Sequence, residues 1–415
     1  MKTVGIISEY NPFHNGHKYH IHTAKKVCGA DYAVCIMSGS FVQRGEPAIM
    51  DKWSRARMAV TNGADLVIEL PFAYACQPAE IFALGAVKIL NGLGVVDYLC
   101  FGSELGDTET LSELAKLLHQ EPEGFKLLLK DYLGQGISYP KAISTALFSY
   151  LGGSEQGYSE EILKNPNNVL GIEYIKALLL LNSDIKPVAV KRMSSGYNDT
   201  AINSSIASAT AVRNEILENG LSESVRSAVP HDVYNILKSS IETGRNPISL
   251  DSFSDIILYK LRTMELDEFE DYLNIREGIE YRLKKFASSC STCEELLEAV
   301  KTKRYTRTYI QRLLCQLMIG IKRSDIAGFK NIHSPAYIRV LAFNGNGKLL
   351  LKSIKENSFY PLVTKAADFC SDNAVLNRMF HFDTLSTDIY NLGYKEYPFR
   401  KASADYLTSP YYHRE

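Results

Sequence analysis

The chain has 415 residues, of which 46% are hydrophobic, and this length is enough for about two or three domains with their own cores. The net charge of −1 excludes a protein whose whole surface attracts nucleic acid, so any basic surface must be local. The sequence contains neither an apolar run of about 20 residues nor the pattern of a signal peptide, and its eight cysteines are scattered. These features predict a cytoplasmic protein with reduced thiols that does not associate with a membrane.

The first predicted strand leads into a turn that contains two histidines. Val4 to Ile7 is an apolar run typical of a short buried strand, and Asn11-Pro12 then turns the chain toward a helix. His14 and His17 lie at the start of that helix, where unpaired backbone N–H groups and the helix dipole favour an anion. Gly16 between them leaves space for a purine against the backbone. We therefore predict that a nucleoside triphosphate binds here and that both histidines are catalytic.

Two other interpretations of these histidines stay open. The pair could be an ordinary surface feature of the helix. Alternatively, four neighbouring histidines could hold a metal ion, although no cysteine or pair of carboxylates lies beside them in the sequence to complete such a site. The four are His14, His17, His20 and His22. Because those further ligands are missing, we predict no metal site built from protein side chains.

Strands and helices alternate after this first unit, which indicates an α/β fold with a Rossmann-like, doubly wound parallel sheet. The further strands are predicted at Asp31–Met37, Asp65–Leu70, Val96–Phe101 and Lys186–Arg192. Such sheets bind ligands beyond the carboxyl ends of their strands. Gly102 and Arg192 lie at two of these ends, so we expect both to face the crevice beside His14. A mostly helical stretch, Leu111–Leu151, interrupts the alternation as an inserted or covering region.

Several basic residues follow the second predicted strand. The polar loop from Ser40 to Pro47 carries Arg44, and the next helix begins with Lys52, Arg55 and Arg57. One interpretation is an ordinary solvated helix face. The other is that Arg44 or Lys52 reaches the phosphate of a nucleotide or of an RNA backbone.

The character of the chain changes after Gly220. Residues 221–330 carry a helical pattern without strand signals, and the segment from Arg282 to Arg323 contains ten lysines and arginines but only three glutamates. Tyr305 and Tyr309 are interleaved with these cations, a combination that suits an RNA backbone and a stacked, unpaired base. The alternative is a solvated charged face. Residues 331–415 mix strand and turn signals and form either a third small domain or a region packed on the helical one.

Four longer strings carry a resemblance to a known family. They are Glu9–His17 (EYNPFHNGH), Met37–Ala48 (MSGSFVQRGEPA), Asp65–Pro71 (DLVIELP) and Phe101–Glu104 (FGSE). Together they resemble the bacterial tRNA(Met) cytidine acetate ligases, which belong to the HIGH-motif nucleotidyltransferase-like superfamily, and the resemblance runs over the whole chain.

The resemblance implies an ATP-dependent ligase that activates acetate as acetyl-adenylate. The acetyl group is then transferred to the exocyclic amine of the wobble cytidine of elongator tRNA(Met), giving N4-acetylcytidine. It also implies three parts of the chain. These are a nucleotidyltransferase-like catalytic domain (1–220), a helical, basic tRNA-binding domain (221–330) and a small C-terminal region (331–415).

The resemblance further implies which residues contact ATP. The expected residues are Ile7, Ser8, Glu9, Tyr10, Asn11, Pro12, Phe13, His14, Asn15, Gly16, His17, Lys18, Tyr19, His20, Gly102, Asn167, Asn168 and Arg192. One residue of the Asn167–Asn168 pair makes the contact, and the resemblance does not say which. Either of them could instead be the N-cap of the helix that follows Pro166.

A second phosphate-binding element is implied at Ile206–Arg213, which resembles the superfamily's terminal phosphate motif. Its candidates are Ser208, Thr210 and Arg213, at the N-terminus of a predicted helix. The alternative is an ordinary N-capped helix. ATP is thus the expected co-substrate, and Mg²⁺ is expected to accompany it.

Two other functions are compatible with parts of the sequence. A small-molecule nucleotidyltransferase, or adenylyltransferase, would use the same histidine turn but would leave the basic helical region unexplained. A non-catalytic RNA-binding protein with a relic nucleotide fold would use the helical region alone. Incubation with ATP, acetate and tRNA separates these functions, because the ligase releases AMP and pyrophosphate, the adenylyltransferase a dinucleotide, and the binding protein nothing. The sequence carries no signal for an oligomeric state.

Overall fold

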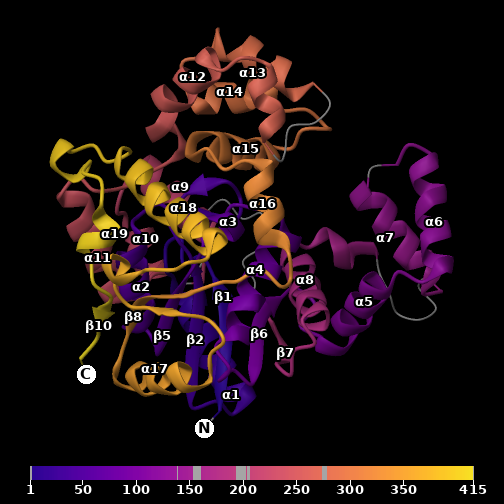
Figure 1. Ribbon diagram of the computed structural model, residues 1–415, viewed down its shortest axis with the longest axis horizontal. Coiled ribbons are helices and arrows are strands. Elements are labelled where there is room, and N and C mark those ends of the chain that lie inside the picture. The colour runs from indigo at the N-terminus through magenta and orange to yellow at the C-terminus, as the bar shows by residue number, and fades with distance from the viewer. Residues whose placement is uncertain are drawn as a thin grey trace.

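The computed structural model describes residues 2–137, 139–152, 160–192, 202, 206–272 and 278–414. At its centre is a sheet in which parallel strands stand in the order β5-β2-β1-β6-β7 (Figure 1). These strands are β1 (Thr3–Ser8), β2 (Tyr32–Ser38), β5 (Leu66–Leu70), β6 (Tyr98–Ser103) and β7 (Lys186–Lys191). They coincide with the predicted strands, and the predicted doubly wound parallel sheet is confirmed.

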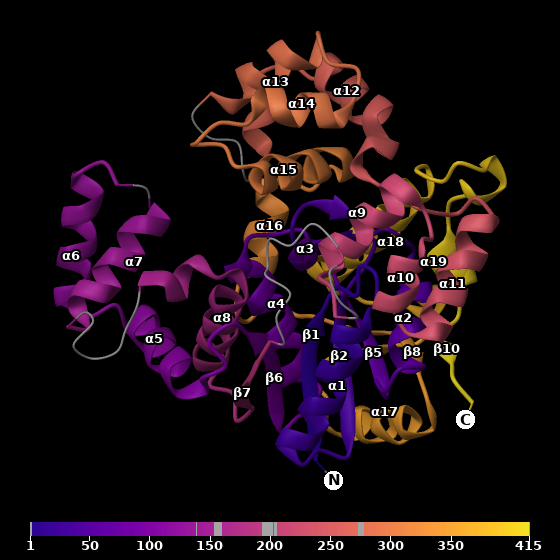
Figure 2. The same ribbon diagram turned by 180° about the vertical axis from the view of Figure 1, so that it is seen from behind.

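Helices cover both faces of this sheet because successive residues of its strands point to opposite sides. In β2, Val34 and Ile36 pack into one core with α4 and α8, whereas Ala33, Cys35 and Met37 pack into a second core with α1, α2 and α9. Figure 2 shows α1 lying in front of the strands on that second side. The bounds are α1 (Asn15–Cys28), α2 (Lys52–Val60), α4 (Ala79–Gly92), α8 (Pro166–Leu180) and α9 (Ala209–Asn219).

Two smaller features complete the first half of the chain. A short antiparallel hairpin of β3 (Phe41–Val42) and β4 (Glu46–Pro47) follows β2, and α3 (Phe72–Ala75) follows β5. Between β6 and β7 the chain forms a helical insert, whose helices α6 and α7 stand to one side of the sheet (Figure 1). The insert consists of α5 (Thr108–Gln120), α6 (Glu123–Gly134) and α7 (Tyr139–Tyr150). The predicted insertion at 111–151 is therefore confirmed.

The region after Gly220 is helical, as predicted. Its helices are α10 (Glu223–Ala228), α11 (His231–Glu242), α12 (Ser254–Thr263), α13 (Ile279–Ala287), α14 (Cys293–Val300), α15 (Arg307–Ile319) and α16 (Arg323–Lys330). However, α11 packs on α2, where Asp232 accepts hydrogen bonds from Thr61 and Asn62 at 2.6 and 2.8 Å. Helices α12–α15, which we call the helical unit, pack on one another above the sheet (Figure 1). Within the described ranges, no helix combines the length and apolar composition needed to cross a bilayer.

The C-terminal region contributes strands to the central sheet, a role that the sequence did not indicate. Its strand β8 (Ile338–Phe343) pairs antiparallel with β5, and β9 (Leu362–Val363) and β10 (Tyr411–Tyr412) pair with β8. The strand signals were local and correct, but the sheet that a strand joins is decided by distant partners. The region also contains α17 (Gly345–Asn357), α18 (Ala374–Asn391) and α19 (Ala404–Leu407), and α18 packs on α3, α15 and α16.

A buried charge cluster ties this tail to the sheet. Lys52 is fully buried, and its Nζ lies 2.7 Å from Glu69 Oε1 in β5 and 2.7 Å from Asp405 Oδ1 in α19. Arg339 in β8 pairs with the same two carboxylates. Both interpretations of Lys52 from the sequence, a solvated helix face and a phosphate contact, were therefore wrong. The partners are remote in the sequence, so composition around residue 52 could not indicate them.

Removing the lysine charge from this cluster should destabilise the fold. Lys52→Met leaves Glu69 and Asp405 buried with only Arg339 as a counter-charge, which should lower the free energy of unfolding by about 3–5 kcal/mol. Urea denaturation measures the change. Glu223→Gln is the matched control, because its pair with Arg226 is exposed and should contribute at most about 1 kcal/mol. Equal stability of the two variants would contradict the structural role of Lys52.

Candidate active site

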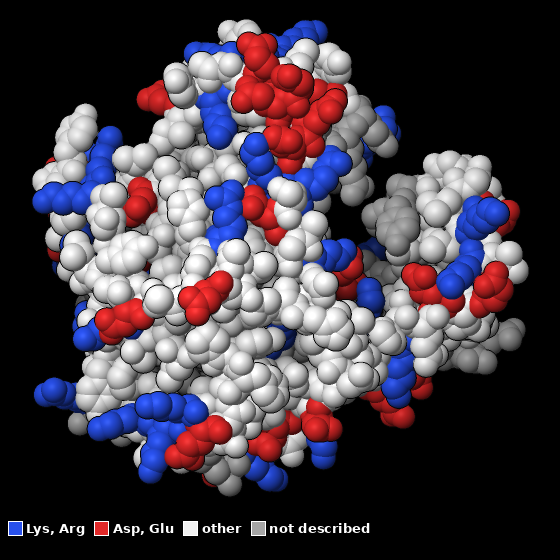
Figure 3. Space-filling model, viewed as in Figure 1, with Lys and Arg blue, Asp and Glu red and all other residues white. Residues whose placement is uncertain are grey.

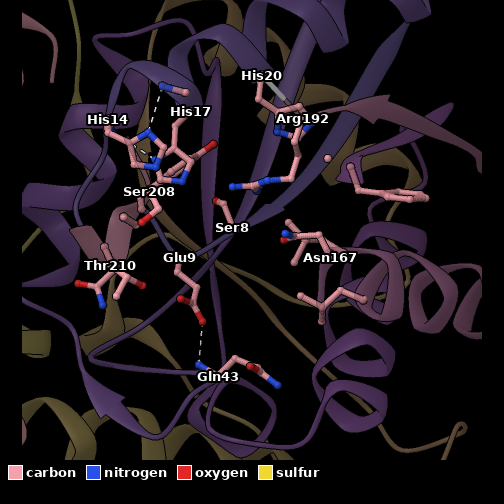
Figure 4. Close-up of a pocket in the computed structure, with 18 of the residues that line it drawn as sticks. Ser8, Glu9, His14, His17, His20, Gln43, Asn167, Arg192, Ser208 and Thr210 are labelled. Carbon is pink, nitrogen blue, oxygen red and sulfur yellow. Dashed lines mark hydrogen bonds between the residues drawn. The ribbon is translucent and has the colours of Figure 1, made fainter. Parts of the chain in front are cut away.

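A cavity of about 240 Å³ lies at the carboxyl ends of β1, β6 and β7. The start of α1, residues of α8 and the start of α9 complete its wall (Figure 4). This is the position at which open parallel sheets bind ligands.

Most of the predicted ATP-binding residues line this cavity. They are Ile7, Ser8, Glu9, Tyr10, Asn11, His14, Gly16, His17, Tyr19, His20, Gly102, Asn167 and Arg192. Five others do not line it, namely Pro12, Phe13, Asn15, Lys18 and Asn168. Phe13 is fully buried in the core beneath α1, and Lys18 lies on the exposed side of that helix. The structure thus brings 13 of the 18 predicted residues to one cavity, whereas the contact of each residue with ATP stays a prediction.

A buried arginine holds the end of β1, which lines the cavity, to the neighbouring end of β2. Arg55 is fully buried, and its guanidinium donates to the carbonyl oxygens of Glu9 at 2.6 Å and Ser38 at 3.0 Å, and also to that of Gly39. Its Nε donates to the carbonyl of Met50 at 3.0 Å. The prediction of a solvated helix face was therefore wrong for Arg55. This side chain ties the end of β1 to the end of β2.

The two histidines of the turn hold each other in one arrangement. The Gly16 N–H donates to His14 Nδ1 at 3.0 Å, and the His14 N–H donates to His17 Nδ1 at 3.2 Å. The two rings stack with their centroids 3.7 Å apart. Since both Nδ1 atoms accept hydrogen bonds, the proton of each neutral ring lies on Nε2, which is thus a donor. Figure 4 shows both rings at one wall of the cavity.

These imidazoles are held in their neutral form. Burial, together with the charges of Arg192 and Arg213, lowers the pKa of His14 from its usual 6.5 to about 3. Burial likewise lowers the pKa of His17 well below its usual value, together with His14, Arg192 and His20. The pKa of His20 falls to about 4 because of burial and Arg192. The positive charge at this wall therefore belongs to the arginines, and the histidines act as neutral donors.

The structure separates the two adjacent asparagines. Asn168 is buried, where its Oδ1 accepts from the Ser103 hydroxyl at 2.7 Å and from the Leu105 N–H at 3.1 Å, so its role is structural. Asn167 lines the cavity and donates to Glu104 Oε1 at 2.5 Å. The N-cap position of α8 is Asn165 instead, so the N-cap interpretation was wrong for both. Of the pair, Asn167 is the one that lines the cavity, and its contact with ATP stays a prediction.

The predicted phosphate motif forms the wall near the histidines. Ser208, Thr210 and Arg213 all line the cavity. Ser208 is also the N-cap of α9, because its Oγ accepts from the Ala211 N–H at 3.0 Å. Arg213 donates to the carbonyl of Asn11 at 2.8 Å, which links α9 to the turn after β1. The N-cap of α9 and the residues of the implied phosphate motif are therefore the same element, and phosphate binding by this element stays a prediction.

Other residues of the cavity were not among the predicted ATP-binding residues. An apolar wall is formed by Phe82, Phe101, Leu170 and Tyr174, and the hairpin contributes Gln43 and Arg44. In the sequence the apolar residues are indistinguishable from core positions of strands and helices, so no signal could have identified them. The presence of Arg44 in the wall agrees with the interpretation that it reaches a phosphate.

The basic segment of the helical unit is largely engaged in contacts of its own. Arg307 pairs with Glu298 at 2.9 Å and also with Glu294, and Lys322 pairs with Asp271 at 2.6 Å. Further cations donate to backbone carbonyls, as Arg282 does to Ala299 and Lys284 to Met264. Figure 3 shows acidic side chains gathered on the helical unit beside lysines and arginines. Fewer of the lysines and arginines in this segment are thus available to contact RNA than the composition predicted.

The tyrosines of this segment also differ from the expectation of an exposed stacking platform. Tyr305 is only 7% exposed and stacks on Tyr309, with ring centroids 6.0 Å apart. Lys303 and Arg304 are exposed beside them. They are two of the exposed cations of the predicted RNA-binding segment, which also include Lys285, Lys301, Lys322 and Arg323.

Comparisons with known proteins agree with this geometry. The sequence model of the family described as HIGH Nucleotidyl Transferase matches residues 1–405. A tRNA(Met) cytidine acetate ligase of Acetivibrio thermocellus is 43% identical over 98% of each chain, and one of Caldicellulosiruptor saccharolyticus is 45% identical over 96% of this chain and 95% of its own. A crystal structure of Thermotoga maritima TmcAL bound with alpha-thio ATP has a TM-score of 0.92 at 34% identity, with 100% of both chains covered. The chain therefore belongs to the HIGH nucleotidyltransferases and, within them, to the family of the tRNA(Met) cytidine acetate ligases.

Proposed function

We propose that this protein is an ATP-dependent ligase that acetylates the wobble cytidine of elongator tRNA(Met), with acetate as the source of the acetyl group. The observation that carries the proposal is a single cavity faced by both histidines of the turn and by the Ser208–Arg213 phosphate motif. This cavity lies in a chain that is 43% identical over nearly its full length to a relative of that name.

In the first step, an oxygen of acetate attacks the α-phosphorus of ATP, and pyrophosphate leaves with the electron pair of the broken P–O bond. The protein contributes mainly position and charge neutralisation. The Nε2–H groups of His14 and His17 donate to phosphate oxygens, while Arg192 and Arg213 supply positive charge. Each hydrogen bond to a charged oxygen contributes about 1.5–3 kcal/mol, or about 10–150-fold in rate when it forms only in the transition state.

Mg²⁺ fits this site as an ion that arrives with ATP. Within the described ranges, no group of three or more His, Cys, Asp or Glu side chains could hold a metal ion. Mg²⁺ in nucleotide sites usually keeps several waters and bonds mainly to the phosphates of the nucleotide, so it does not need a dedicated cage of protein carboxylates. The ion would neutralise phosphate charge, while the residues of this chain orient the α-phosphate.

In the second step, the exocyclic amine of the cytidine attacks the acetyl carbonyl, and AMP leaves. The base must be turned out of the anticodon stack to enter the cavity. We assign the chemistry to the catalytic domain (1–220) and the RNA contacts to the helical domain (221–330). Lys303 and Arg304 are the exposed cations that support this assignment.

Acetate should drive exchange between ATP and pyrophosphate without tRNA, because the cavity already contains both phosphate-binding walls. His17→Ala removes one donor and should slow this exchange by about 10–150-fold. Binding of tRNA, measured by filter retention, should persist because the helical unit is unaltered. Exchange that strictly requires tRNA would contradict a separate adenylate intermediate, and a dinucleotide product would favour the adenylyltransferase.

The neutral state of His14 should also appear in the pH dependence of stability. Its pKa in the folded protein is about 3, so between about pH 6 and 4 the unfolded chain binds a proton that the folded protein does not. The free energy of unfolding therefore falls as the pH drops below about 6.5. His14→Gln should reduce this slope by up to about 1.4 kcal/mol per pH unit, measured by urea denaturation in a pH series. Identical slopes in both proteins would show that folding does not lower the pKa of His14.

Reversing the charges of Lys303 and Arg304 should uncouple the two half-reactions. For single strands, log affinity falls with log salt concentration at a slope of about −0.7 for each cation that contacts a phosphate. Loss of two such contacts should therefore make the slope less steep by about 1.4. Acetyl transfer at sub-saturating tRNA should fall, while acetate-dependent exchange continues. The matched control reverses the charges of Lys352 and Lys355, which are exposed on α17 at the opposite end of the molecule (Figure 1). Equal salt slopes for the two double variants would place the RNA contacts elsewhere.

A further inference from the structure

Glu9 is a carboxylate in a cavity that otherwise suits anions. Among the described residues that line the cavity it is the only acidic one. A triphosphate and an acetate are both negative, so a carboxylate in the same wall opposes their binding through Coulomb repulsion. A residue placed there at such a cost indicates a substrate group that donates a hydrogen bond or a proton.

The position of Glu9 is held from two directions. Its carbonyl oxygen accepts from the buried Arg55 guanidinium at 2.6 Å, and its Oε1 accepts from the Gln43 N–H at 2.9 Å (Figure 4). No hydrogen bond to Oε2 is found within the described ranges. One carboxylate oxygen is therefore anchored to the hairpin, and the other remains available to a substrate in the cavity.

The Glu9 end of the cavity is also the end that contacts the helical unit. Figure 4 shows Glu9 and Gln43 on the side of the cavity away from His20. The Gln43 carbonyl accepts from Arg312 at 3.4 Å, and the Gly45 carbonyl accepts from the Cys315 thiol at 3.2 Å, both in α15. A Cβ on Gly45 would lie 2.1 Å from the backbone nitrogen of Arg312, so the hairpin packs closely on that helix. An RNA base delivered by the helical unit would reach the cavity beside Glu9.

We propose that Glu9 accepts first a hydrogen bond and then a proton from the exocyclic amine of the cytidine during acetyl transfer, an inference that rests on the proposed function. The amine nitrogen forms a bond to the acetyl carbonyl carbon. The bond between that carbon and the phosphate oxygen of AMP breaks, and its electron pair leaves with AMP. One proton of the amine passes to Glu9 Oε2 and from there to solvent.

The other groups of the cavity are less suited to this task. His14 and His17 already use Nδ1 to accept backbone N–H groups, and their pKa values lie below the usual range, so they remain donors. Arg192 and Arg213 have no proton-accepting atom. Carboxylates, in contrast, are the side chains that accept from the cytosine amine in nucleic-acid recognition, and a positioned general base contributes about 10²–10⁴-fold in rate.

The test separates the two half-reactions in the full-length protein. Glu9→Gln keeps an oxygen for the Gln43 N–H but cannot take a proton. Single-turnover transfer from enzyme-bound acetyl-adenylate to a tRNA(Met) transcript should slow by about 10²–10⁴-fold, far more than acetate-dependent exchange slows. Hydroxylamine added to the same variant should still trap the acetyl group, since this strong nucleophile does not need the base. Glu9→Asp, which keeps a carboxylate, should recover part of the lost transfer rate.

Two results would overturn the proposal. Equal slowing of exchange and transfer, with a raised Mg²⁺ requirement, would mean that Glu9 serves the metal–nucleotide complex. Loss of the preference for ATP over GTP in exchange would mean that Glu9 recognises the adenine amine. Glu223→Gln is the control, because this carboxylate is exposed on α10, lies outside the cavity wall and should leave both half-reactions unchanged. If the proposed function itself were wrong, the unaltered protein would show no acetate-dependent exchange between ATP and pyrophosphate, before any variant is compared.

Discussion

The guanidinium of Arg55 fixes the backbone on which the cavity depends. It is fully buried, and the cost of removing it from water lowers its pKa. Carbonyl oxygens at the ends of β1 and β2, together with that of Met50, offset this cost. The carbonyl of Glu9 is one of the groups that accept these hydrogen bonds. The turn that carries both histidines therefore starts from a fixed point. The arginine thus positions the cavity without lining it.

The fold determines which residues of the cavity are charged and which are neutral. Burial keeps His14 and His17 neutral, and the backbone fixes which of their nitrogens carries the proton. Arg192 and Arg213 provide the positive charge and, by doing so, help to hold the histidines neutral. The same cavity therefore offers neutral donors, cations and one carboxylate within its described wall, which suits a reaction that first handles phosphates and then an amine.

The β3–β4 hairpin connects the cavity to the helical unit. Its Gln43 backbone binds Glu9 on one side and Arg312 on the other, and Glu46 contacts both Arg213 and Gln311. A change in how the helical unit sits on the sheet would thus reach Glu9 and Arg213 through a few direct contacts. This arrangement gives a direct physical connection between the helical unit and the cavity wall.

The sequence alone determined the parts that depend on neighbouring residues. Apolar runs located the parallel strands, and the turn after β1 located the histidine wall, because strand burial and helix starts are encoded locally. The tertiary structure decided what depends on remote partners: Lys52 pairs with Asp405, β8 joins β5, and Arg307 is neutralised by Glu294 and Glu298. It also separated Asn167 from Asn168, since adjacent residues of a helix point in different directions and Ser103 lies on only one side. Local periodicity specifies which elements form, whereas the partner of each charge and the wall of each cavity follow from packing across long distances in the chain.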